Sequence, residues 1–125
     1  MSKFKKLTRV SEFRFILLVH NLASQRKFYE ETFGWPVIND WGGGVLYNTG
    51  ASVLELIQDS LASPSNGSSR IAISVPDAWK LFEELKDKVT IEFPLRNNSW
   101  GDTSFRIKDP EGFFITIFTP TSNII

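Results

Sequence analysis

The strongest constraint on the fold of this chain is an internal repeat. Residues 19–22, Val-His-Asn-Leu, correspond to residues 75–78, Val-Pro-Asp-Ala, at an offset of 56 residues. Residues 53–56, Val-Leu-Glu-Leu, correspond to residues 114–117, Phe-Ile-Thr-Ile, at an offset of 61. A repeat of this length is typical of two copies of one supersecondary unit that share a core. The difference between the offsets predicts an insertion in a loop of the second copy, at residues 95–101.

The first copy has the pattern of a strand, a helix and three further strands. Residues 13–19 are apolar and β-prone, and Asn21 then stands where a helix N-cap is expected. Apolar positions keep a helical period to about residue 33, and Gly34 provides the stop. The runs that follow, separated by glycine-containing turns, predict strands at residues 36–40, 45–48 and 52–58.

The second copy repeats this order after a segment rich in Ser, Asn, Pro and Gly, which predicts a linker at residues 59–69. Asp77 takes the N-cap position of the second helix, and residues 109–112, Asp-Pro-Glu-Gly, predict a tight turn. Strands are predicted at residues 71–75, 89–93, 103–108 and 113–118. We therefore expect one α+β domain over residues 1–125, with two tandem βαβββ modules, at about 13–58 and 70–120, forming a curved mixed sheet around a concave cavity.

Composition excludes several classes of function. Lys plus Arg and Asp plus Glu balance at 14 each, which argues against nucleic-acid or membrane-surface partners. The chain has no cysteine, so thiol catalysis, thiolate metal sites and disulfides are excluded. No apolar run is long enough for a membrane span, and the basic N-terminus lacks the features of a signal peptide. We expect a soluble cytoplasmic protein, and its eleven Phe and four Trp residues suit a ligand cavity.

Three short motifs in a fixed order resemble one known family. They are residues 19–22, the Phe28-Tyr29 pair and residues 33–35, Phe-Gly-Trp. The Asp-Pro-Glu-Gly turn, which precedes the last apolar strand, adds a fourth feature. In this order they resemble the vicinal oxygen chelate (VOC) superfamily, from about residue 13 to residue 120. That superfamily includes glyoxalase I, extradiol dioxygenases, and fosfomycin and bleomycin resistance proteins.

The resemblance also implies where a metal would be held. Metal-dependent members place four side chains on the cavity face, and the matching positions here are Arg14, Glu55, Arg70 and Thr116. Only Glu55 matches a metal ligand of the family, because a guanidinium stays protonated and has no lone pair to donate. The sequence thus argues against a divalent metal and against glyoxalase-type or dioxygenase metal chemistry, and no cofactor is expected.

Strand alternation extends the set of side chains that face the cavity. The period places Arg106 and Phe114 on the same face as Thr116, and Trp41 and Trp100 are expected at the mouth. Glu55 has two interpretations: it forms a buried ion pair with Arg14 or Arg70, or it contacts a ligand together with them. One carboxylate cannot neutralise three guanidiniums, so we expect the remaining arginines to bind a carboxylate or phosphate. The candidate ligand-binding residues are Arg14, Glu55, Arg70, Trp100, Arg106, Phe114 and Thr116.

Three functional hypotheses remain open at this point. The first is metal-independent binding of a small molecule, as the resemblance to the bleomycin-resistance branch implies, with an anionic, aromatic compound as one option for the ligand. The alternative is a metal-dependent lyase, isomerase or dioxygenase of the glyoxalase I type with a divergent site. A third is a structural or regulatory module with a closed cavity. The resemblance further implies a homodimer, and whether modules pair within one chain or across two is left open.

Overall fold

Two tandem βαβββ modules, as predicted, make up the computed structural model, which describes residues 10–63 and 69–120. The first module consists of β1 (Arg14–Val19), α1 (Leu22–Phe33), β2 (Val37–Asp40), β3 (Gly44–Asn48) and β4 (Val53–Gln58). The second consists of β5 (Arg70–Ser74), α2 (Ala78–Leu85), β6 (Thr90–Asn98), β7 (Asp102–Lys108) and β8 (Phe114–Pro120). In the predicted linker, residues 59–63 contain no helix or strand, and residues 64–68 lie outside the described residues.

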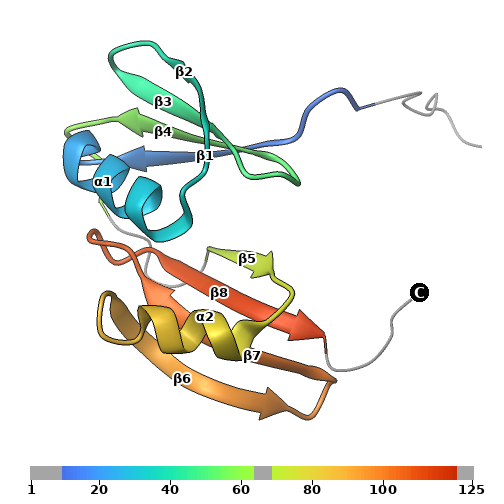
Figure 1. Cartoon of the computed structure of the whole chain (residues 1–125). Coiled ribbons are helices and arrows are strands. Elements are labelled where there is room, and N and C mark those ends of the chain that lie inside the picture. Colours follow the sequence, from blue (N-terminus) through green and yellow to red (C-terminus); the bar gives the residue numbers. More distant parts are fainter. Residues whose placement is uncertain (1–9, 64–68, 121–125) are drawn as a thin grey trace, which may run out of the picture.

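Each module forms its own four-stranded mixed sheet, with strand orders β1-β4-β3-β2 and β5-β8-β7-β6. The β1–β4 and β5–β8 pairs are parallel, and the other pairs are antiparallel. Figure 1 shows α1 on the side of the first sheet that faces the second module. None of the helices in the described ranges is long and apolar enough to cross a membrane.

The predicted helix caps are confirmed. The Asn21 side chain accepts a hydrogen bond from the Ser24 backbone N–H at 3.1 Å, and Asp77 accepts one from Lys80 at 3.0 Å. These bonds satisfy backbone donors that a helix start leaves without partners. Gly34 ends α1 in the left-handed conformation, with φ of 66°, which a residue without a Cβ adopts at little cost.

Alternation along β1 separates a core face from an open face, as predicted. Phe15, Leu17 and Val19 pack into or against the hydrophobic core. Ile16 and Leu18 are about half exposed on the opposite face, at 51% and 49%. The face of the first sheet that carries Arg14 and Glu55 is therefore the one turned away from α1.

The second module differs from prediction at β6. The strand was expected at residues 89–93 with a loop insertion at 95–101, but it runs from Thr90 to Asn98, so most of the insertion lies within a longer β6–β7 hairpin. Register shifts between Ile91 and Phe93 and between Phe93 and Arg96 absorb the extra residues as bulges. Pro94, which signals the end of a strand, is tolerated because β6 lies at the sheet edge.

A buried carboxylate joins the two modules. Asp109 Oδ2 accepts hydrogen bonds from Gln25 Nε2 at 2.8 Å and from the Tyr29 hydroxyl at 2.9 Å, both in α1. Its Oδ1 accepts the backbone N–H groups of Glu111 and Phe113 within its own turn. One side chain thus fixes the β7–β8 turn and holds it against the helix of the other module.

A second carboxylate and an aromatic contact reinforce this junction. Glu111 accepts the backbone N–H groups of His20 and Asn21, both at 2.8 Å, at the start of α1. The rings of Phe15 in β1 and Phe113 in the β7–β8 turn lie 5.8 Å apart between centroids. The hydrophobic core is accordingly shared by both modules.

Replacing Asp109 should destabilise the whole fold. Asp109→Ala leaves two side-chain donors and two backbone N–H groups without an acceptor, and we expect the free energy of unfolding to fall by on the order of 3 kcal/mol. Urea unfolding followed by circular dichroism measures this change. Asp87→Ala is the control, because Asp87 is exposed just after α2. Equal effects of the two substitutions would contradict the role assigned to Asp109.

Candidate functional site

Glu55 is buried on the open face of the first sheet, with only 7% of its surface exposed. Arg14 Nη1 donates to its Oε1 at 3.0 Å, and the Trp41 indole Nε1 donates to its Oε2 at 3.2 Å. The expected arginine partner is thus confirmed, and it is Arg14. The carboxylates of Glu12 and Glu55, each hydrogen-bonded to the guanidinium, raise the pKa of Arg14.

Trp41 reaches Glu55 because the β2–β3 turn has no side chains beneath it. A Cβ added to Gly43 or Gly44 would lie 2.7 Å or 2.5 Å from the indole ring, closer than van der Waals contact allows. The turn is closed by a hydrogen bond from the Trp41 backbone N–H to the Gly44 carbonyl at 3.1 Å. The two glycines therefore let the indole fold over the sheet, where it covers one side of the Glu55 carboxylate.

The second sheet carries the other predicted residues. Thr116 in β8 is paired with Arg106 in β7 and with Ala72 in β5, and Phe114 is paired with Lys108 and Arg70. Because directly paired residues point to the same face, the predicted placement of Arg106 beside Thr116 is confirmed. The Arg106 Nε donates to Thr116 Oγ1 at 3.4 Å, a long hydrogen bond.

Cations and aromatic rings gather around Arg106. Its guanidinium carbon lies 5.0 Å from the Phe93 ring centroid and 5.7 Å from that of Phe114. Arg96 lies over the same Phe93 ring at 4.6 Å. Burial, and then the nearby charges of Arg70 and Arg96, lower the pKa of Arg106 from its ordinary value. We call these five residues, Arg70, Phe93, Arg96, Arg106 and Phe114, the arginine face.

The three guanidiniums of the arginine face form no salt bridge within the described ranges, although the charge of the nearby Glu92 acts on Arg106. Lys108 pairs with Glu92 at 3.3 Å and Arg14 pairs with Glu12 and Glu55, and no salt bridge within the described residues involves Arg70, Arg96 or Arg106. Three positive charges on one surface repel one another unless an anion or solvent offsets them. The arrangement is suited chemically to hold an anion beside an aromatic surface.

Sequence reasoning missed Phe93 and Arg96 as members of this group. The predicted strand stopped at residue 93, before Pro94, and alternation cannot be counted through the bulge between Phe93 and Arg96. The residues after Pro94, Leu-Arg-Asn-Asn-Ser, carry no strand signal, because Asn is depleted in strands.

The structure divides the predicted residues between two surfaces. Arg14 and Glu55 lie together on the first sheet, while Arg70, Arg106, Phe114 and Thr116 lie on the second. Trp100 is 72% exposed at the β6–β7 turn and makes no hydrogen bond or ring contact with other described residues. Trp100 therefore lies with neither the first-sheet residues nor the second-sheet residues.

The four positions that hold a metal in some VOC proteins do not fit one here. Arg14 is bonded to Glu55, Arg70 is a second cation, and Thr116 is bonded to Arg106. Nowhere in residues 10–63 and 69–120 do three His, Cys, Asp or Glu side chains gather as ligands for a metal ion. His20 is exposed, with its Nδ1 3.0 Å from the Ser60 carbonyl. On either surface, a divalent cation would meet a guanidinium where it needs oxygen or nitrogen lone pairs.

A double-mutant cycle tests the ion pair on the first sheet. Arg14→Ala should lower the free energy of unfolding, because Glu55 loses the cation that neutralises it in a buried position. Adding Glu55→Gln should restore part of that loss, since an amide needs no counter-charge. Urea unfolding of both single variants and the double variant gives the coupling. Glu12→Ala, which removes the exposed partner of Arg14, is the control and should cost less than Arg14→Ala; additive effects at Arg14 and Glu55 would exclude the pairing.

Comparison with known proteins places this geometry in a family. The sequence profile of the glyoxalase-like domain matches residues 13–122, which is most of the chain. No curated protein matches the sequence. Solved structures that share the fold include a glyoxalase/bleomycin resistance protein/dioxygenase from Nocardioides, at 16% identity and a TM-score of 0.77, covering 95% of this chain and 89% of that one.

Two further structures show the same architecture at low identity. A glyoxalase/bleomycin resistance protein/dioxygenase from Alicyclobacillus acidocaldarius has 13% identity and a TM-score of 0.74, covering 90% of this chain and 92% of its own. A lactoylglutathione lyase from Agrobacterium tumefaciens has 16% identity and a TM-score of 0.73, covering 91% and 95%. With the matched profile and the two βαβββ modules, these likenesses lead to one conclusion: the chain belongs to the glyoxalase-like domain family of the VOC superfamily.

Proposed function

We propose that this protein binds a small anionic molecule with an aromatic part, without a metal, on the arginine face of its second sheet. The observation that carries the proposal is the set of three guanidiniums, Arg70, Arg96 and Arg106, which form no salt bridge in the described part of the chain; the nearby Glu92 is paired with Lys108. A protein surface that only had to be soluble would not need to bring three like charges together around two rings.

The chemistry of the anion follows from the residue type. A guanidinium presents a planar fork of donors that matches the two oxygens of a carboxylate or phosphate. Arg106 is the central member, because it is partly buried and lies between Phe93 and Phe114. Desolvation strengthens a charge-assisted hydrogen bond, so Arg106 is the arginine that we expect to contribute most to affinity.

The two phenylalanine rings favour a ligand with a flat apolar part. Phe93 and Phe114 flank Arg106 on the open side of the sheet, and Phe93 is exposed. A planar ring placed on this surface would gain stacking area from the side chains. We therefore expect aromatic carboxylates and aryl phosphates to bind better than acetate or inorganic phosphate.

The hydrogen bonds of Glu55 support binding without a metal. Its two oxygens are engaged by Arg14 and by the Trp41 indole. A metal-dependent lyase, isomerase or dioxygenase would have to remove both contacts before Glu55 could coordinate. Elemental analysis of the purified protein tests this point: stoichiometric Zn, Ni, Mn or Fe bound to the folded chain would refute the proposal.

We also propose that the protein forms a homodimer in which a second copy covers the open faces. Ile16 and Leu18 are about half exposed on the open face of the first sheet, and Phe13 is 73% exposed just before it. Exposed apolar side chains that cluster on one face favour an interaction surface. Analytical ultracentrifugation measures the mass, and a monomer at micromolar concentration would contradict this proposal.

Ligand binding by the arginine face can be measured directly. Isothermal titration should detect binding of phenyl phosphate and benzoate but not of methyl benzoate, which has the ring without the charge. Arg106→Ala should weaken phenyl phosphate binding at least about tenfold, which corresponds to 1.4 kcal/mol. Arg70→Ala should weaken it by a smaller factor, because Arg70 lies at the exposed edge.

A matched variant separates a local contact from general electrostatics. Lys80→Ala removes one positive charge from the exposed surface of α2 and should leave phenyl phosphate binding unchanged. If Lys80→Ala and Arg106→Ala weaken binding equally, net charge accounts for the effect and the site is wrong. If neither anion binds the unaltered protein, the proposed ligand class is wrong.

A further inference from the structure

The internal repeat gives the junction between the two modules two turns that correspond to each other. The β7–β8 turn, residues 109–113, contacts α1 and β1 of the first module. The equivalent β3–β4 turn, residues 49–52, lines one cleft together with β5 of the second module. Both turns close in the same way, because the backbone N–H of Asp109 donates to the Phe113 carbonyl and that of Thr49 to the Ser52 carbonyl, each at 3.0 Å. Phe113 and Ser52 therefore hold equivalent places, directly before the last strand of each module.

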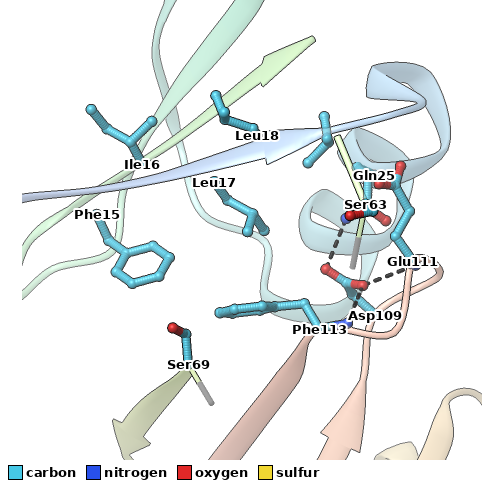
Figure 2. Close-up of a pocket in the computed structure, with 11 residues that line it drawn as sticks. Phe15, Ile16, Leu17, Leu18, Gln25, Ser63, Ser69, Asp109, Glu111 and Phe113 are labelled. Atoms are coloured by element: carbon cyan, nitrogen blue, oxygen red, sulfur yellow. Dashed lines mark hydrogen bonds between the residues drawn. The ribbon is translucent and has the colours of Figure 1, made fainter. Parts of the chain in front are cut away.

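Three side chains of the β7–β8 turn hold the modules together. Asp109 and Glu111 accept hydrogen bonds from the first module, and the Phe113 ring lies beside Phe15. Figure 2 shows this arrangement, with the Phe113 ring reaching toward β1 and Asp109 meeting Gln25. The cavity that remains there has a volume of about 280 Å³.

The β3–β4 turn has none of these three groups. Thr49 stands where Asp109 stands in the other turn, directly after the third strand, and Ser52 replaces Phe113. The Thr49 hydroxyl donates to the Ser52 carbonyl, and the Ser52 hydroxyl donates to the carbonyl of Phe13. Both bonds stay within the first module. No side chain of this turn forms a hydrogen bond to the second module within the described ranges.

An apolar cleft with a volume of about 390 Å³ opens at this turn, and we call it the intermodule cleft. None of the described residues that line it is charged, and none belongs to the arginine face. Trp35 and, from the second module, Ile71, Ile73 and Phe118 are among its walls and are only partly buried. Apolar surface in the cleft therefore stays in contact with water, and a bound apolar molecule would remove it from water.

The repeat indicates which apolar group fits the cleft. Phe15 in β1 corresponds to Ile71 in β5, since each is the second residue of its strand and pairs with the second residue of β4 or β8. The Phe113 ring packs beside Phe15, whereas Ser52 brings no ring to the cleft that it shares with Ile71. The missing group is an aromatic ring.

The walls of the cleft also favour a ring without a charge. Phe15, Trp35 and Phe118 offer aromatic surface, against which a planar ring packs better than a saturated one. A charged ligand would lose hydration without meeting a counter-charge, because no charged side chain of the described residues lines the cleft. This chemistry is the opposite of that on the arginine face.

We propose that the intermodule cleft binds a small, neutral aromatic molecule, whose ring stands beside Ile71 as the Phe113 side chain stands beside Phe15. By the volume that water takes in the liquid, the cleft holds on the order of ten non-hydrogen atoms, which is one ring with a short substituent. The bound ring contacts both modules at the turn that lacks a polar connection. The proposal stands whether or not the arginine face binds an anion.

Three probes of similar size test the proposal: phenol, cyclohexanol and benzoate. Each is titrated into the ¹⁵N-labelled full chain, and the backbone amide signals of Ser52 and Ile73 are followed by two-dimensional NMR. Phenol should shift both signals, with a Kd at least about threefold lower than that of cyclohexanol, because its ring packs against aromatic walls. Benzoate should leave both signals unchanged, since it carries a charge.

Three outcomes would overturn the proposal. If no probe shifts the Ser52 and Ile73 signals, the cleft holds only solvent. If cyclohexanol binds as tightly as phenol, the cleft does not select an aromatic ring. If benzoate shifts the same signals with the Kd of phenol, the cleft does not select a neutral ligand. None of these outcomes bears on phenyl phosphate binding at Arg106, so the two sites can fail separately.

Two variants and a matched control add independent checks. Ser52→Phe supplies the ring from the chain itself and should raise the Kd of phenol at least about tenfold, because the place of the ligand is taken. Ala51→Leu adds apolar atoms to the same wall without removing a hydrogen bond of the side chain, and it should also weaken phenol binding. Ser99→Phe makes the Ser-to-Phe change at an exposed position of the β6–β7 turn and should leave phenol binding unchanged. The dispersion of the amide spectrum shows whether each variant is folded, and if Ser52→Phe unfolds, Ala51→Leu and the three probes on the unaltered chain still decide.

Discussion

The hydrogen bonds to Asp109 are the interaction on which the rest of this structure depends. The buried carboxylate ties Gln25 and Tyr29 of α1 to the turn before β8. The same carboxylate shapes that turn through two backbone N–H groups. Because one charged group needs several donors to be stable in a buried position, the two modules cannot separate without exposing or orphaning it.

The two open faces share the same strand arrangement but differ in how their charged side chains are paired. Equivalent positions of the repeat carry Glu55 in the first sheet and Thr116 in the second. On the first sheet, one guanidinium neutralises the carboxylate and an indole donates a hydrogen bond to it. On the second sheet, the hydroxyl takes only a long hydrogen bond from Arg106, and the positive charges remain. The side chains at a few strand positions, rather than the fold, thus determine where an anion is attracted.

Local rules predicted most of the fold. Asn21, Asp77 and Gly34 act where capping chemistry places them, and β1 alternates as its sequence indicates. The Arg14–Glu55 pair followed from the cost of an unpaired buried charge, although the choice between Arg14 and Arg70 required coordinates. Contacts between modules could not be predicted, because the bonds from Gln25 and Tyr29 to Asp109 join residues about 80 positions apart with no local pattern. Phe93 and Arg96 escaped prediction because bulges interrupt the period of two on which strand reasoning relies.

The irregular course of β6 also limits how this protein can associate. An edge strand with a free row of N–H and C=O groups is a template for another strand, and it promotes fibre growth when it is flat. β6 is such an edge by position, but Pro94 lacks an N–H, two register shifts twist the strand, and Arg96 adds a charge. Open-ended strand addition at this edge is therefore blocked. The same bulges that bring Arg96 over Phe93 therefore also make this edge of the sheet less able to aggregate.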